Sequence, residues 1–128
     1  MVVDTSIILA IFFNERHAVW ATDVLERNAG SLRMSTVNLA ECLILIADRQ
    51  PHLAGELQER LLRSGIRFVP PNAAQASAAA KARLKYPLNL GDCFAYALAA
   101  AEGCPLLTLD TDFRRVDLTV VLPGSQSK

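Results

Sequence analysis

The sequence of 128 residues has few of the features that define several common protein classes. Its three cysteines, Cys42, Cys93 and Cys104, are an odd number and lack the C-x-x-C spacing of many zinc sites. We therefore expect no disulfide framework, and we interpret them as small buried residues of a cytoplasmic protein. No basic leader precedes Asp4, and the apolar run 7–13 is far shorter than the ~20 residues that cross a bilayer. The sequence thus predicts neither a signal peptide nor association with a membrane.

The chain also lacks an excess of charge of either sign. Lys and Arg together number 13, Asp and Glu together number 13, and the formal net charge is zero. This balance argues against a protein that coats nucleic acid regardless of sequence, because such binding needs many basic residues. A local patch of Arg would still suffice for phosphate contacts. The G-x-S-x-G, Walker A and G-x-G-x-x-G sequences are absent, which removes the core signatures of serine hydrolases, P-loop enzymes and dinucleotide enzymes.

What is present is an alternation of short apolar runs with helical patterns. The runs predict strands at 1–3, 31–35, 66–69, 106–109 and 118–122, and the helical patterns cover 5–13, 15–28, 36–49, 51–64, 73–85 and 90–102. Short, continuously apolar strands are typical of a parallel sheet covered by helices on both faces. We therefore predict one α/β domain over residues 1–123, with a mainly parallel sheet of four to five short strands. A polar tail, 124–128, is expected to be frayed.

Two similar segments each place an acid three residues after an asparagine. They are Asn38-Leu-Ala-Glu-Cys42 and Asn89-Leu-Gly-Asp-Cys93. An asparagine that caps a helix, followed by an acid at the third helical position, forms a capping box. We therefore expect both segments to begin helices, with Glu41 and Asp92 in the first turns. The positive end of each helix would favour the ionised carboxylate there.

Two further acids follow predicted strands: Asp4 ends the first and Asp110 the fourth. In an open parallel sheet, strand ends and helix starts meet at one edge, where ligands bind. Asp4, Glu41, Asp92 and Asp110 are therefore expected to converge. Carboxylates that share a site repel one another, and a hard divalent cation such as Mg²⁺ relieves that repulsion. Taken singly, each acid also has a simpler explanation as a helix cap or a turn residue.

Four segments occur in a characteristic order: V-V-D-T-S at 2–6, N-L-A-E at 38–41, L-N-L-G-D-C-F-A-Y-A-L-A at 88–99 and L-L-T-L-D-T-D-F at 106–113. Together they resemble the PIN-domain family, and within it the VapC-type toxins of type II toxin–antitoxin pairs. The resemblance covers nearly the whole chain. It implies a three-layer α/β/α fold and a divalent-metal-dependent endoribonuclease that hydrolyses RNA phosphodiesters.

The resemblance also implies roles for particular residues. Asp4, Glu41, Asp92 and Asp110 would be catalytic and would hold Mg²⁺ or Mn²⁺, with Asp112 as an additional ligand. Thr5, Ser6, Asn38 and Thr108 would support this cluster. Independently of the resemblance, Arg114 and Arg115 follow the acidic loop and could reach RNA phosphates; an ordinary solvated basic pair is the alternative explanation. The implied partners are the RNA substrate, a cognate antitoxin and a second copy in a homodimer.

Two alternatives remain open at the level of sequence. The first is a PIN-like module that binds RNA or protein without catalysis; the presence of all four acids argues against it. The second is a phosphotransferase that uses Asp4 as a phosphoaspartyl nucleophile. One class of such enzymes needs a second Asp at the position that Ser6 occupies. Another class, the receiver type, needs a Lys near the last strands, and the only lysines here are Lys81, Lys85 and Lys128.

Overall fold

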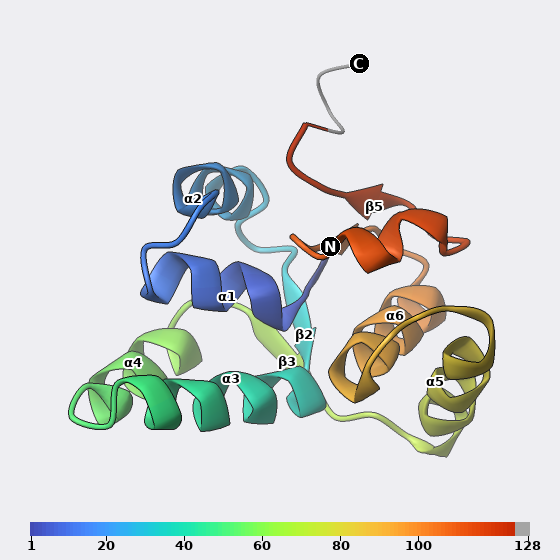
Figure 1. Cartoon of the computed structure of the whole chain (residues 1–128), viewed down its shortest axis with the longest axis horizontal. Helices are drawn as coiled ribbons and strands as arrows, with labels where there is room; N and C mark the ends of the chain where they lie inside the picture. The colour runs from blue at the N-terminus through green and yellow to red at the C-terminus, as the bar shows by residue number, and fades with distance from the viewer. Residues whose placement is uncertain (125–128) are drawn as a thin grey trace.

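The computed structural model describes residues 1–124, and its elements alternate as expected (Figure 1). The strands are β1 (Val2–Val3), β2 (Arg33–Ser35), β3 (Arg67–Val69), β4 (Leu106–Leu107) and β5 (Val120–Val121). The helices are α1 (Thr5–Phe12), α2 (Ala18–Arg27), α3 (Thr36–Arg49), α4 (Ala54–Leu62), α5 (Ala73–Lys85) and α6 (Leu90–Glu102), together with a 3-10 helix, η1 (Thr111–Arg115). Apart from Gly124, the tail predicted to be frayed lies outside the described residues.

The strands form one parallel sheet in the order β3-β2-β1-β4-β5. From β1 the chain moves outward through β2 and β3, and it then returns to the other side of β1 for β4 and β5. The strand order therefore reverses between β1 and β4, the position at which open α/β sheets bind ligands. Asp4 lies at this position, where its backbone N–H donates to the carbonyl of Leu107 at 3.0 Å.

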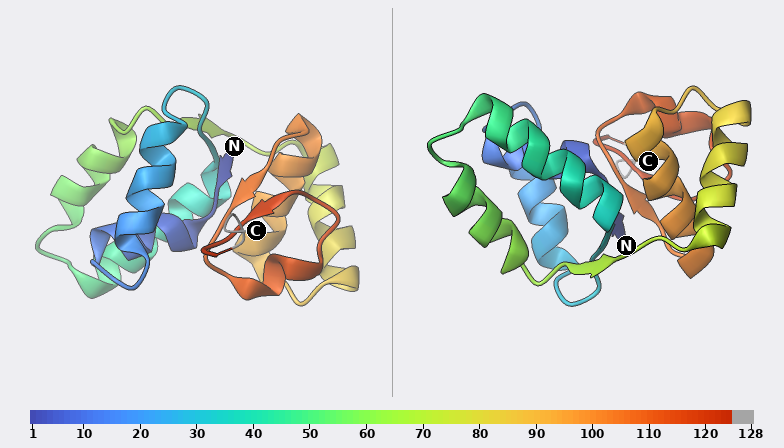
Figure 2. Two further views of the ribbon diagram at one scale, coloured as in Figure 1. Left: turned by 90° about the horizontal axis from the view of Figure 1, so that it is seen from above. Right: turned by 90° about the horizontal axis from the view of Figure 1, so that it is seen from below.

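Helices cover both faces of the sheet, as predicted. Successive residues of a strand point to opposite faces. Val3 and Leu107 accordingly belong to the apolar core under α1, α2, α3 and α4, whereas Val2 and Leu106 belong to the core under α5, α6 and η1. Figure 2 shows the first four helices on one side of the strands and the last two on the other. The three-layer α/β/α fold is thus confirmed.

The structure differs from the prediction mainly at element ends. Helix α2 begins at Ala18 rather than near residue 15, because Asn14 and His17 have positive φ angles of 49° and 71° and break the preceding helical path. The 3-10 helix η1 lies in a segment for which no element was predicted. Within residues 1–124, no helix combines the length and the apolarity that crossing a membrane requires.

Candidate active site

Asp4 directly follows β1 at the carboxyl edge of the sheet, and the residue is only 2% exposed. Its Oδ2 accepts hydrogen bonds from Ser6 Oγ and from Thr108 Oγ1, both at 2.8 Å. Burial raises the pKa of this carboxyl group, the charge of Glu41 raises it further, and the two hydroxyl donors oppose the increase. The protein therefore holds Asp4 in a fixed orientation in a place where its negative charge is costly.

Ser6 and Thr108 also join the ends of two neighbouring strands. Ser6 Oγ accepts a hydrogen bond from the backbone N–H of Leu109 at 3.0 Å, and Thr108 Oγ1 accepts one from that of Asp110 at 3.0 Å. Each hydroxyl thus donates to the Asp4 carboxylate while it accepts from the loop after β4. The segments that carry Asp4 and Asp110 are thereby locked together, although more than a hundred residues separate them in the chain.

Helix α6 begins with the capping box that the sequence predicts. Asn89 Oδ1 accepts from the backbone N–H of Asp92 at 2.8 Å, and Asp92 Oδ2 accepts from that of Asn89 at 3.2 Å. Asp92 is 6% exposed. Burial, followed by the charges of Asp4, Asp110 and Glu41, raises its pKa to about 7. Asp92 therefore lies within reach of the charges of the other three predicted acids.

Helix α3 covers the predicted residues 36–49, but its N-cap differs from the expected one. Ser35, at the end of β2, is the N-cap, and its Oγ accepts from the backbone N–H of Val37 at 3.2 Å. The expectation that Asn38 caps this helix is wrong, because the strand passes directly into the helix and Ser35 offers a cap three residues earlier. Asn38 instead lies inside the helix, fully buried, and Glu41 lies in the second turn.

The buried Asn38 joins three helices at the site. Its Nδ2 donates to Thr5 Oγ1 on α1 at 3.2 Å and to the carbonyl of Gly91 on α6 at 3.0 Å. Thr5 Oγ1 in turn donates to Glu41 Oε1 at 2.6 Å. Asn38 thus sets the position of Thr5, and Thr5 sets the position of the half-buried Glu41 carboxylate.

Two residues of this arrangement, Asn89 and Gly91, are absent from the site residues predicted from the sequence. Both lie in the segment that carries Asp92, where Asn89 orients that acid and Gly91 accepts from Asn38. The sequence did contain a sign that Gly91 matters. Glycine within a helix is disfavoured relative to alanine, so a glycine in the first turn of a predicted helix needs a reason.

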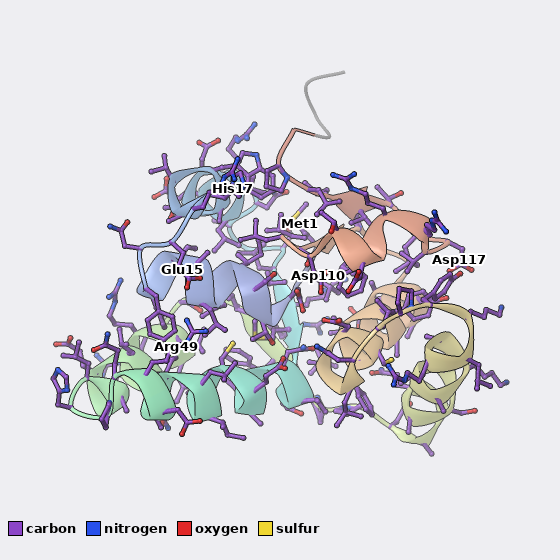
Figure 3. All side chains as sticks on the ribbon, viewed as in Figure 1. Met1, Glu15, His17, Arg49, Asp110 and Asp117 are labelled. Atoms are coloured by element: carbon purple, nitrogen blue, oxygen red, sulfur yellow. The ribbon has the colours of Figure 1, made fainter. Side chains whose placement is uncertain are left out.

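The two acids after β4, Asp110 and Asp112, differ in how far they are buried. Asp110 is half-buried, and its Oδ1 accepts from the backbone N–H of Asp112 at 2.8 Å, which caps η1. Figure 3 shows Asp110 between α1 and η1. Asp112 is exposed, and its backbone N–H donates to the Asp110 carboxylate. Arg114 and Arg115 are exposed on η1, directly after the acids.

The chemistry of this cluster fits a hard divalent cation. As they stand, no three His, Cys, Asp or Glu side chains of residues 1–124 are arranged to hold a metal ion. The donors at the site are nonetheless carboxylate oxygens, which Mg²⁺ and Mn²⁺ prefer. No Lys or Arg in this range forms an ion pair with Asp4, Glu41, Asp92 or Asp110. Burial, and after it the charges of neighbouring acids, raises the pKa values of Asp4 and Asp92, and a bound cation would oppose both effects.

Comparison with known proteins places this geometry in context. Residues 1–118 match the family described as PIN domain. The chain is 39% identical over 127 residues to ribonuclease VapC42 of Mycobacterium tuberculosis, which covers 92% of this chain and 96% of the relative. Two solved structures share the fold: VapC20 of M. tuberculosis, titled a Sarcin-Ricin loop cleaving toxin, and a toxin–antitoxin complex from Klebsiella pneumoniae. VapC20 has a TM-score of 0.79 and 18% identity, and the match covers 92% of this chain and 95% of VapC20. The Klebsiella pneumoniae chain has a TM-score of 0.77 and 23% identity, and the match covers 95% of this chain and 96% of that one.

Proposed function

The chain belongs to the PIN domain family, and from this membership we propose that it is an endoribonuclease that depends on a divalent metal ion and serves as the toxin of a toxin–antitoxin pair. Its relative VapC42 is named a ribonuclease, and the identity extends over nearly the whole of both chains. The family assignment gives no support to the phosphotransferase alternative.

The observation that best supports the proposal is that three other acids raise the pKa of Asp92, at the start of α6. Asp92 is influenced there by the charges of Asp4, Asp110 and Glu41, although these residues come from four separate elements or loops. A fold stabilised only by its core would gain nothing from this repulsion, which raises the cost of burying each carboxylate. The cost is understandable if the cluster exists to bind a cation.

In this proposal Asp4, Glu41, Asp92 and Asp110 would hold Mg²⁺ or Mn²⁺. The ion supplies Lewis-acid stabilisation of the negative charge that develops on phosphodiester oxygens during hydrolysis. The protein contributes orientation: Ser6 and Thr108 fix the carboxylate of Asp4, and Thr5 fixes that of Glu41. Asp112, exposed and two residues after Asp110, would be an additional ligand.

The RNA strand would pass over the exposed face of η1. Arg114 and Arg115 follow Asp110 within five residues and are both exposed, so their guanidinium groups can reach phosphates beside the cluster. This position agrees with a chain of zero net charge, because binding then depends on a local patch rather than on the whole surface.

The proposed protein partners are a second copy of the chain and an antitoxin. Ile44 on α3 and Leu90 on α6 are 61% and 72% exposed, and both line a groove beside Glu41, which suits a homodimer contact.

A separate apolar cleft of about 410 Å³ between α1, α2 and α4 includes Ile8, Phe12 and Leu25. We assign this cleft to an apolar segment of the antitoxin, since a structure with the same fold is a toxin–antitoxin complex.

The decisive experiment is RNA cleavage with Mn²⁺, with and without a chelator, by the parent protein, Asp4→Asn and Asp92→Asn. Asp48→Asn, an exposed acid on α3, is the matched control. We expect the parent and the control to cleave RNA. In Asp4→Asn and Asp92→Asn we expect the cleavage rate to fall by about 100-fold or more, as it does when catalytic groups are removed from other enzymes. Folded Asp4→Asn and Asp92→Asn variants that cut as fast as the parent would refute the assigned site.

The same assay separates catalysis from binding. A non-catalytic module would bind RNA without cutting it, and chelator would leave that binding unchanged. In the double variant Arg114→Ala/Arg115→Ala we expect a higher KM with a similar kcat, because phosphate contacts outside the cluster position the substrate.

A further inference from the structure

Gly91 has no backbone reason to be glycine. It is the second residue of α6, it is buried, and its φ angle lies outside the left-handed region that favours glycine. At a helical position of this kind alanine is the more stable residue, because glycine loses more conformational freedom on folding. The reason for glycine must therefore lie in what surrounds it.

The surroundings of Gly91 are occupied by a carboxylate. A Cβ atom at this position would lie 2.5 Å from Glu41 Oε1, 2.9 Å from Glu41 Cδ and 3.0 Å from Glu41 Oε2. These separations are shorter than van der Waals contact, so the whole carboxylate group rests against the α-carbon of Gly91. Gly55 on α4 provides a contrast, since a Cβ there would meet nothing within 4 Å.

Glu41 has little freedom to withdraw. Thr5 Oγ1 donates to the same oxygen, Oε1, from the side of α1 at 2.6 Å. Asn38, one turn earlier on α3, donates to the carbonyl of Gly91 at 3.0 Å and so holds α3 against the start of α6. The carboxylate is thus confined between Thr5 and the backbone of Gly91.

We propose that Gly91 is a positioning residue: its missing side chain leaves the space in which the Glu41 carboxylate lies beside Asp92. The inference rests on the proposed function, in which these two acids bind the same divalent ion. A methyl group at residue 91 would push the carboxylate of Glu41 away from Asp92 or force α3 and α6 apart. Either displacement would spoil the spacing of two ligands without removing any ligand.

The steric part of the proposal is tested by thermal unfolding without metal. We expect Gly55→Ala to leave the Tm unchanged or raise it, and Gly91→Ala to lower it by roughly 5 °C. In a Glu41→Ala background the carboxylate is gone, and Gly91→Ala should then no longer lower the Tm. A double-mutant cycle of this kind isolates the contact between the two residues. An equal decrease in both backgrounds, or an increase like that of Gly55→Ala, would overturn the proposal.

The functional part is tested by binding of Mn²⁺ to the same proteins, followed through the electron paramagnetic resonance signal of the free ion. We expect Gly91→Ala to weaken binding about 10-fold, as the loss of a residue that orients metal ligands does, and Gly55→Ala to bind as the parent does. Unchanged affinity in Gly91→Ala would refute the positioning role. A parent protein that binds no Mn²⁺ would count against the proposed metal-dependent function, and the double-mutant cycle would still decide the steric claim.

Discussion

Replacing Asp92 by Asn should make the metal-free protein more stable while it destroys the proposed site. In the unfolded chain this carboxyl group ionises near its ordinary pKa of 3.8, whereas in the folded protein its pKa is raised to about 7. Between these values the native state holds a proton that the unfolded state has released. Stability of the parent therefore falls as the pH rises from about 4 to about 7, and it stays low above that range.

The size of the effect follows from the two pKa values. One pKa unit corresponds to about 1.4 kcal/mol, so the difference between 3.8 and about 7 amounts to at most about 4 kcal/mol. Burial is the main cause of the increase and repulsion from Asp4 is the next, so the figure is smaller if Asp4 remains protonated. Asparagine resembles the protonated acid, and its Oδ1 can still accept from the backbone N–H of Asn89. The variant should therefore gain most of this free energy, or roughly 5–15 °C in Tm, at about pH 8.

The assay is thermal unfolding of the parent, Asp92→Asn and the exposed control Asp48→Asn, in chelator, between about pH 4 and pH 8. The parent and Asp92→Asn should coincide at the acid end and diverge as the pH rises, whereas the control follows the parent throughout. Added Mn²⁺ should raise the Tm of the parent more than that of the variant, because a ligand of the native state stabilises it. An Asp92→Asn protein less stable than the parent at the alkaline end, or a difference independent of pH, would refute the reasoning.

Two further predictions follow from the hydrogen bonds and the exposed surface. Thr108→Val removes the donor to Asp4 and should lower the free energy of unfolding by about 1–3 kcal/mol in urea. The control Thr22→Val removes only a bond to a helix carbonyl and should cost less; equal costs would argue against a special role for Thr108. Ile44→Glu should shift the proposed homodimer toward monomer in analytical ultracentrifugation with an unchanged Tm for the monomer, and an unaltered sedimentation profile would locate the dimer contact elsewhere.

Much of the fold could be predicted from the sequence because each strand is a short apolar run and each helix has its own periodicity. The same local signals place Asp4 and Asp110 after strands. The capping box at Asn89 was predictable for the same reason, since the two residues that make it, Asn89 and Asp92, are close in the sequence. The contacts of Asn38 were not, because they depend on α1, α3 and α6 meeting, and no local pattern specifies which helices meet.

The two similar segments show why local similarity misled at one helix and not at the other. Before Asn89 the chain approaches α6 from a loop, so asparagine itself caps the helix and directs Asp92 from the first turn. Before Asn38 the chain comes straight from β2, Ser35 takes the cap, and the acid is carried into the second turn. An acid placed there cannot be oriented by its own helix end, so Glu41 depends on Thr5 for a hydrogen bond and on Gly91 for space. The Glu41 carboxylate is thus positioned by residues of two other helices, so substitutions at Thr5 and Gly91 test its position without removing an acid.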